Sequence, residues 1–206
     1  MFWNILDQNR LNILPKLTDL SKDFYLAGGT GLALQLGHRD SIDFDFFTKT
    51  AFSNMEIFNK IKRVFIGHII VKNQDEKDTL TVFIDENIKL SFFRYKYDLI
   101  KPLVSTEFFK LASIEDIGCM KLSAIVSRYL LKDYVDLYWI LHQISLSDLI
   151  SLDQKKHWEL DTNLVLKSLV YFDDVELEPI VFKNKMEVSF DEVKKFLRKT
   201  VKKFLD

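Results

Sequence analysis

The sequence contains one cysteine, Cys119, three prolines and six glycines among its 206 residues. A single cysteine excludes an internal disulfide and fits a reducing compartment. So few prolines and glycines favour long helices and short loops over an all-β protein with many turns. No apolar run reaches the roughly 18 residues of a membrane span, and the N-terminus lacks the pattern of a signal peptide. We therefore expect a soluble cytoplasmic protein without a membrane partner.

An excess of charge of either sign is also missing. The chain has 29 basic and 30 acidic residues, a formal net charge of −1. This balance excludes a global attraction to nucleic acid, so any such binding would need a local basic patch. Hydrophobic residues make up 48% of the chain and 18 of them are Phe. That composition supports a sizeable core and argues against disorder.

The first half of the chain has the pattern of a mixed α/β unit. Ser53 and Glu56 form a capping box before an amphipathic helix predicted over residues 52–65. An earlier helix, ending near Leu20, is expected to begin close to Pro15. The strands are predicted over residues 24–27, 42–47, 68–72, 79–85 and 88–95, the last two as a hairpin.

Beyond Pro102 the pattern becomes helical. Ser113 is placed to cap a long helix that we expect to continue to about Leu131. Further helices are predicted over residues 132–144, 160–171 and 191–205. The expected fold is α+β, with a mixed sheet and flanking helices in residues 1–104 and a helical domain in residues 105–206.

The strongest chemical signal lies between Phe24 and Phe47. Gly28 and Gly29 follow a short apolar strand, where they allow a tight turn and a close approach to a ligand. Thr30 is placed to cap the next helix and Gly37 to end it. Free N–H groups in such a turn suit an anion, and a phosphate is the obvious candidate.

Two acids follow this turn. Asp43 and Asp45 are two residues apart in a predicted strand, so their side chains share one face. Adjacent carboxylates repel each other unless a cation lies between them. Hard oxygen ligands beside a phosphate suit Mg²⁺, or Mn²⁺, rather than zinc. The turn and the acids together predict a phosphate next to a divalent metal ion.

Three stretches resemble a known family. FYLAGGTGLALQLGHRDSIDFDFF (24–47) resembles the signature of the nucleotidyltransferase superfamily typified by DNA polymerase β, and within it the AbiEii/AbiGii toxin family, with GGT-x-L-A-L and H-R-x-S-x-D-x-D-F-F. DIGCMKLSAIVSRYLLKDYVDLYWIL (116–141) is similar to the family's lysine helix and its K-D-x-x-D-L motif. SLVYFDDVELEP (168–179) is similar to its C-terminal segment. The resemblance therefore runs from about Phe24 to the end of the chain.

The resemblance implies a nucleotidyltransferase that moves a nucleoside monophosphate from an NTP to an acceptor hydroxyl. Asp43 and Asp45 would be catalytic metal ligands for Mg²⁺ (or Mn²⁺), and superfamily members hold two such ions. The resemblance also implies that Lys121 is a catalytic residue. The residues that it implies for nucleotide binding are Gly28, Gly29, Thr30, Arg39, Arg128 and Asp136. The implied partners are an acceptor, either RNA such as tRNA or a protein, and a cognate antitoxin in a toxin–antitoxin or phage-defence pair.

The spacing of Lys121, Arg128 and Lys132, by 7 and then 4 residues, would place them on one helical face. Lys121 would contact the triphosphate. Asp133 and Asp136, three residues apart on one face, could orient Lys121 or Arg128 or contact the nucleotide. Asp136 could also pair with Lys132 one turn away.

One position departs from the superfamily pattern. Ser91, in the stretch KLSFF, stands where many members place a third acid on a strand. A serine cannot serve as an anionic base at neutral pH. The general base is therefore left open between Asp43, Asp45 and metal-assisted ionisation. The same departure keeps a second class open, a catalytically degenerate nucleotidyltransferase fold that binds a nucleotide or a partner.

Overall fold

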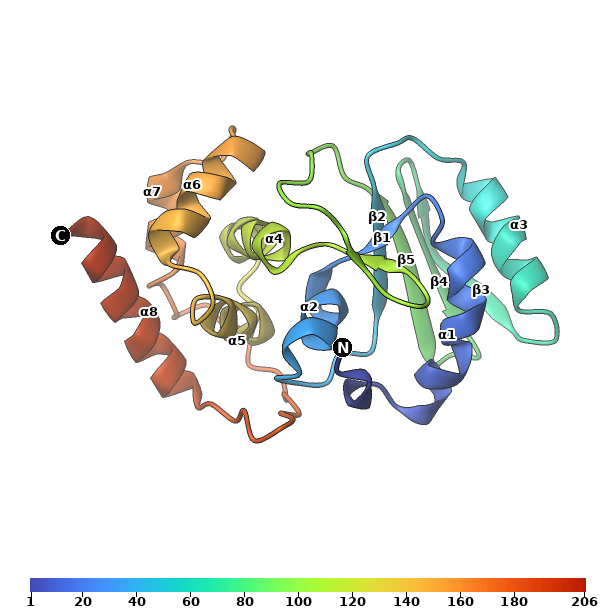
Figure 1. The fold of residues 1–206 in the computed structure, drawn as a ribbon, viewed down its shortest axis with the longest axis horizontal. Coiled ribbons are helices and arrows are strands. Elements are labelled where there is room, and N and C mark those ends of the chain that lie inside the picture. Colours follow the sequence, from blue (N-terminus) through green and yellow to red (C-terminus); the bar gives the residue numbers. More distant parts are fainter.

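A seven-stranded mixed sheet lies at the centre of the N-terminal half of the computed structural model, which describes residues 1–206 (Figure 1). The strand order is β3-β4-β5-β2-β1-β7-β6. Strand β2 runs parallel to β5, and β1 runs parallel to β7, while the other neighbours are antiparallel. The strands are β1 (Tyr25–Leu26), β2 (Phe44–Thr48), β3 (Ile70–Glu76), β4 (Thr79–Ile84), β5 (Ile88–Arg94), β6 (Val104–Ser105) and β7 (Lys110–Leu111).

Helices surround this sheet and form the second half of the molecule. A short 3₁₀ helix, Trp3–Ile5, precedes them. The helices are α1 (Gln8–Leu20), α2 (Gly28–Leu36), α3 (Asn54–Val64), α4 (Ile114–Ser127), α5 (Leu131–Ile140), α6 (Leu146–Lys156), α7 (Thr162–Ser168) and α8 (Phe190–Leu205). The predicted α+β fold is confirmed. Strand β7 joins the sheet from beyond residue 104, and the division of the chain at that residue stays a prediction.

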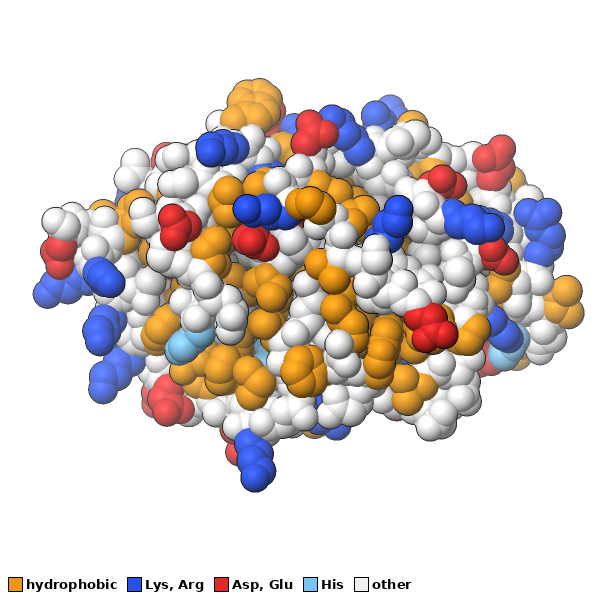
Figure 2. Space-filling model, viewed as in Figure 1, with side chains coloured by type: hydrophobic (Ala, Val, Ile, Leu, Met, Phe, Trp, Pro, Cys, Tyr) orange, Lys and Arg blue, Asp and Glu red, His pale blue; other side chains and the backbone are white.

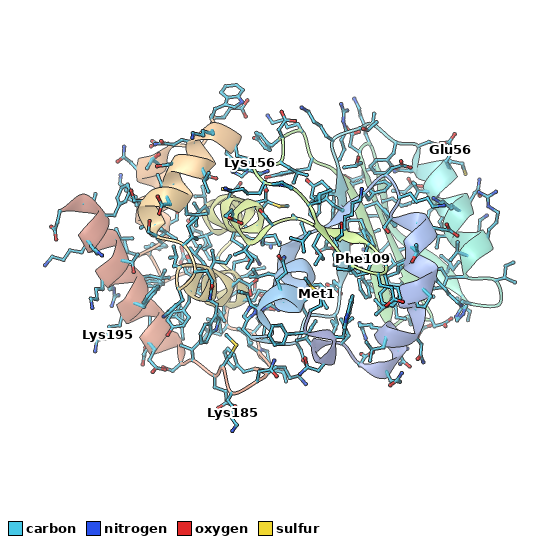
Figure 3. All side chains as sticks on the ribbon, in the orientation of Figure 1. Met1, Glu56, Phe109, Lys156, Lys185 and Lys195 are labelled. Carbon is cyan, nitrogen blue, oxygen red and sulfur yellow. The ribbon has the colours of Figure 1, made fainter.

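Side-chain alternation separates the two faces of the sheet. Phe44 and Phe46 of β2 and Phe92 of β5 are fully buried in a core that includes residues of α1 and α3. Phe109, labelled in Figure 3, packs edge-on against Phe44 and Phe46. Burying a Phe side chain contributes about 1.5–3 kcal/mol. This apolar packing therefore fixes which way β2 faces, and the acids of β2 must point to the opposite side.

A second core fills the space between α2 and the helices of the C-terminal half. Leu32 of α2 belongs to this core, whereas Ala33 and Leu34 belong to the first. Helix α2 is therefore shared by both cores, and it lies between the sheet and helices α4 and α5 (Figure 1). No helix has the length and apolar character needed to cross a membrane.

The predicted helix starts at Ser53 and Ser113 are confirmed, and Ser189 caps the helix predicted over residues 191–205. Each of these serines accepts a hydrogen bond from the backbone N–H three residues later. Gly37 ends α2 in the left-handed conformation, with φ +73°, also as predicted. These signals are local, because the cap and the helix it starts or ends are adjacent in sequence.

Three predicted helix boundaries are wrong, and one helix was not predicted. Helix α1 begins at Gln8, because the Asp7 side chain caps it, and Pro15 lies inside it. The long helix predicted to Leu131 ends at Ser127, where Arg128 takes an extended conformation and a second helix begins three residues later. Helix α6, which Ser145 caps, was not predicted at all. Gly28, rather than the residue after Thr30, starts α2.

Candidate active site

The acid pair lies at the start of β2. Asp43 directly precedes the strand and Asp45 lies within it, on the face opposite to Phe44 and Phe46. The Asp43 side chain is 43% exposed, and Asp45 is half-buried. The two carboxylates therefore share a face, as the alternation of residues predicts, and this face turns away from the phenylalanine core.

Strand β5 lines the acid pair because it runs parallel to β2. The strand register places Asp45 beside Ser91 and Phe44 beside Leu90, so Lys89 lies next to Asp43. Lys89 Nζ is 3.3 Å from Asp43 Oδ2. Ser91 Oγ is buried and has no hydrogen-bond partner. The position expected for a third acid is thus occupied by a neutral hydroxyl, with a lysine two residues before it on the same face.

The surroundings of Asp45 disfavour its negative charge. Burial raises the pKa of this carboxyl, and the charge of Asp43 raises it further. Lys89, the neighbouring Ser91 hydroxyl and, more weakly, Lys121 oppose this shift, but the pKa remains above its ordinary value. A bound cation would relieve the cost of this ionised carboxylate.

The glycine turn brings the start of α2 against the acid pair. Gly28 has φ +64°, and a Cβ atom added to it would lie 3.4 Å from Asp45 Oδ2. No side chain caps α2, and the first N–H groups of a helix have no partner within it. These free N–H groups and the positive end of the helix dipole suit an anion beside the acids.

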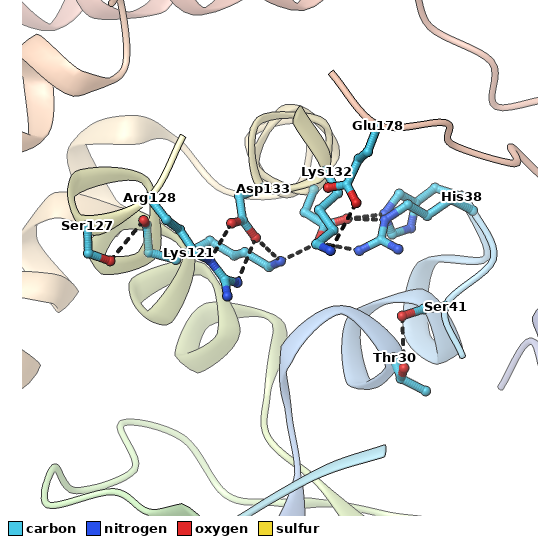
Figure 4. A network of polar contacts seen from close by, with 12 residues as sticks. Thr30, His38, Ser41, Lys121, Ser127, Arg128, Lys132, Asp133 and Glu178 are labelled. Carbon is cyan, nitrogen blue, oxygen red and sulfur yellow. Dashed lines mark hydrogen bonds and ion pairs between the residues drawn. The ribbon is translucent and has the colours of Figure 1, made fainter. Parts of the chain in front are cut away.

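Thr30 does not cap α2, which corrects the cap prediction. Its hydroxyl donates to the backbone oxygen of Asp43 and lies 2.8 Å from Ser41 Oγ, as Figure 4 shows for the second contact. The Thr30 side chain therefore ties α2 to the loop that leads into β2, and it helps to hold Asp43 in place.

A second cluster centres on Asp136 of α5, which is completely buried. Arg39 donates two hydrogen bonds, of 2.7 and 2.8 Å, to the Asp136 carboxylate, and His38 Nε2 lies 2.9 Å from Asp136 Oδ1. Lys121 Nζ lies 2.5 Å from the other oxygen. Burial alone would raise the pKa of Asp136, but these positive charges and hydrogen bonds hold it well below its usual range.

Lys121 is held by two acids rather than being free. Its Nζ atom also donates to Asp133 Oδ1 at 2.6 Å, and the side chain is 5% exposed. Arg128 donates to the other oxygen of Asp133 at 2.9 Å and is 53% exposed (Figure 4). The cluster thus contains Lys121, which is buried and fixed by two acids, and Arg128, whose side chain reaches solvent.

The two clusters meet at Gly29. A Cβ atom added to this residue would lie 2.6 Å from Arg39 Nη2, so the guanidinium packs directly on the glycine turn. Lys121 is also close enough to Asp45 for its charge to lower the pKa of that carboxyl. One site is therefore assembled from α2, β2 and β5 on one side and from α4 and α5 on the other.

This geometry agrees with the comparisons to known proteins. Residues 13–205 match the family described as "Nucleotidyl transferase AbiEii toxin, Type IV TA system". The chain belongs to the AbiEii family. The predicted family and the enzyme class, a nucleotidyltransferase, are thereby confirmed.

Several proteins are similar to this AbiEii-family chain. An uncharacterised protein of Aquifex aeolicus (strain VF5) is 36% identical over 209 residues, which cover 98% of each chain. The structure of MenT4, nucleotidyltransferase toxin Rv2826c from Mycobacterium tuberculosis H37Rv, superposes with a TM-score of 0.64 at 14% identity, covering 96% of this chain and 82% of that one. JHP933 from Helicobacter pylori gives 0.60 at 20% identity, with 97% and 95% covered. The two structures share its fold.

The AbiEii-family chain differs from the sequence prediction in its basic residues. Lys121, Arg128 and Lys132 do not share one helical face, because the helix breaks at Arg128. Lys132 pairs with Glu178 at 3.1 Å and not with Asp136. Arg128 lies in this break between the two helices, and from there its side chain bonds Asp133 in the first turn of α5.

Two residues of the AbiEii-family site were not predicted from the sequence. His38 was noted only as part of the H-R motif, yet it contacts Asp136 in a fully buried position. Lys89 was given no role, yet it is the charged neighbour of Asp43. The signal for Lys89 was its place two residues before Ser91, which becomes informative once β2 and β5 are known to be parallel.

The donor set fits a hard divalent cation. No group of three or more His, Cys, Asp and Glu side chains is arranged to hold a metal ion. The acid pair therefore supplies two carboxylates, with the unpartnered hydroxyl of Ser91 beside Asp45. Carboxylate and hydroxyl oxygens suit Mg²⁺ or Mn²⁺, and the raised pKa of Asp45 marks a place where positive charge is favourable.

Replacing Gly29 by Ala should reduce nucleotidyl transfer about 100-fold, because the new methyl group would displace the Arg39 guanidinium from the turn. Transfer of a labelled nucleotide measures the effect. Gly67→Ala is the matched control, because its Cβ would meet no atom within 4 Å. That control should lose some stability, since Gly67 has φ +86°, but keep its activity. Equal activity of the two variants would contradict the contact between Arg39 and the turn.

Proposed function

We propose that this protein transfers a nucleoside monophosphate from an NTP to a hydroxyl group of RNA in a Mg²⁺-dependent reaction. It acts as the toxin of a pair with a cognate antitoxin. The observation that carries the proposal is the acid pair, Asp43 and Asp45, beside the uncapped start of α2. Such an arrangement binds a metal ion and a phosphate next to each other.

The chain's own residues have separate tasks in this reaction. The N–H groups at Gly28 and Gly29 receive the triphosphate, and Arg39 supports the turn that presents them. Asp43 and Asp45 would hold the divalent cation, which would offset phosphate charge and favour ionisation of the attacking hydroxyl. A bond forms between the acceptor oxygen and the α-phosphorus, the bond to pyrophosphate breaks, and the hydroxyl proton is released.

Lys121 and Arg128 differ in burial and in ion pairs, and we therefore assign them different roles. Lys121 is buried between Asp133 and Asp136, so we assign it the role of a fixed positive charge behind the acid pair. Arg128 is half-exposed and bound to one acid only. It is the cation that can turn towards the triphosphate, and Asp133 then keeps Lys121 as its partner.

An RNA acceptor is supported by the basic outer face of α8. Figure 2 shows blue side chains along the edge of the molecule that α8 forms, and Lys195 is labelled there in Figure 3. The exposed cations on this helix are Lys195, Arg198, Lys199, Lys202 and Lys203. A row of lysine and arginine side chains attracts a phosphate backbone, and the attraction weakens with salt. We propose an acceptor such as tRNA on this basis.

The test is incubation of the full chain with each labelled NTP, total RNA, total protein and Mg²⁺. The expected result is label in the RNA fraction with one NTP preferred, and none after chelation of the metal. Label in the protein fraction would replace RNA by a protein acceptor. Mg²⁺-dependent NTP binding with no transfer to any fraction would instead support a binding module, the class that Ser91 leaves open.

A further inference from the structure

The charges around the acid pair are unusual for a site that holds two metal ions. Three carboxylates with two divalent cations carry one net positive charge. The acid pair has only two carboxylates, and Ser91, in the third position, is neutral. If two divalent cations were bound here together with Lys89, the excess positive charge would be much larger.

Lys89 supplies the charge that a second cation would otherwise bring. Its ammonium group lies 3.3 Å from Asp43 Oδ2, and its side chain is 33% exposed. It also acts on Asp45, since it opposes the raised pKa of that carboxyl more strongly than any other positive charge. One lysine therefore acts electrostatically on both acids and offsets one of their two negative charges.

We propose that the site holds a single divalent cation, and that the Lys89 ammonium group replaces a second one beside Asp43. This inference rests on the proposed function. Two carboxylates, one lysine and one divalent cation again carry one net positive charge. The geometry permits this replacement, because Lys89 and Ser91 lie on the same face of the sheet as Asp43 and Asp45.

The pairing could instead be an ordinary cross-strand ion pair on a sheet surface, and such pairs contribute little. The two explanations differ in what Lys89→Met does. A purely structural lysine would, on removal, leave nucleotidyl transfer unchanged. A lysine that repels the incoming cation would, on removal, tighten Mn²⁺ binding about tenfold while nucleotidyl transfer falls, because the charge on the phosphates is no longer offset.

The decisive measurement is the number of Mn²⁺ ions in the complex with a non-hydrolysable NTP analogue. Mn²⁺ is titrated by electron paramagnetic resonance, with the full chain in excess over the α,β-methylene analogue of each common NTP in turn. We expect one ion per bound analogue in the natural chain. The double variant K89A/S91D, which restores a third acid and removes the lysine, should bind two.

Two ions, or none, in the natural chain would overturn the proposal. Looser Mn²⁺ binding in Lys89→Met would also overturn it. Lys49→Met is the matched control, because Lys49 forms a comparable ion pair, 2.6 Å from Asp98, away from the acid pair, and its removal should change neither count nor affinity. Transfer with two ions bound contradicts only this inference, whereas one ion bound without transfer contradicts only the proposed reaction.

Discussion

Replacing Asp45 by Asn is expected to abolish nucleotidyl transfer and, at the same time, to make the folded protein more stable. The loss of activity, about 1,000-fold or more, follows from the loss of one of two carboxylates for the cation. The gain in stability, on the order of 1 kcal/mol, follows from the raised pKa of Asp45, because burial and Asp43 disfavour its ionised form in the folded state.

The sign of the pH dependence separates this effect from a general stabilisation. Because the folded state holds the Asp45 proton more tightly than the unfolded state, this carboxyl favours folding at low pH, and that contribution is lost as the pH rises through the folded pKa. The advantage of Asp45→Asn should therefore be present at neutral pH and vanish in acid. Urea unfolding at several pH values measures it.

Two further variants complete the comparison. Asp43→Asn should also lose transfer, because the cation would again keep only one carboxylate. Asp98→Asn, at a surface position 81% exposed, should change neither activity nor unfolding. If Asp45→Asn transferred nucleotide at a tenth of the natural rate or faster, Asp45 would not be a metal ligand.

The second large effect is expected at Asp136. Its replacement by Ala should destabilise the protein by about 3–5 kcal/mol, the cost of leaving buried charges without their partner. Arg39, Lys121 and His38 all contact this fully buried carboxylate. Asp136 is the only acid with which Arg39 forms an ion pair, and the Arg39 side chain is 6% exposed.

Equilibrium unfolding in urea gives the magnitude, and pH gives a further check. The pKa of Asp136 is held well below its usual range, so its contribution is present at neutral pH and is lost as the pH falls through the folded pKa. The natural chain and Asp136→Asn should therefore converge in stability under acid conditions. Asp98→Ala, which removes an exposed pair with Lys49, serves as the control and should leave unfolding unchanged. An Asp136→Ala variant as stable as that control would show that the cluster adds nothing to folding.

Much of the fold follows from short-range signals in the sequence. The alternation in Ile42–Phe47 predicts which side chains of β2 face the core, because successive residues of a strand point to opposite faces. The serine caps of α3, α4 and α8 are equally local. The helix start predicted near Pro15 was wrong, because the stronger signal, the Asp7 cap, lies two full turns earlier.

The site was less predictable, because its contacts join residues far apart in the chain. Nothing near Lys89 in sequence indicates that it will lie against Asp43, since that contact depends on the parallel pairing of β2 with β5. Arg39 and Asp136 are likewise brought together only by the packing of α2 against α5. The helix break at Arg128 was not predicted either, because the apolar spacing continues across it and Arg is a good helix former.

The parallel pairing of β2 and β5, together with the Asp136 cluster, has a consequence for the order in which the chain is made. The acid pair gains its neighbours on β5 only when that strand has been added beside β2. Arg39 and Lys121 can contact Asp136 only when α5 is present. Because synthesis proceeds from the N-terminus, a ribosome-bound chain that stops before Asp136 has its acids but not the support behind them. We therefore expect the nascent chain to stay inactive until α5, and with it most of the chain, has left the ribosome.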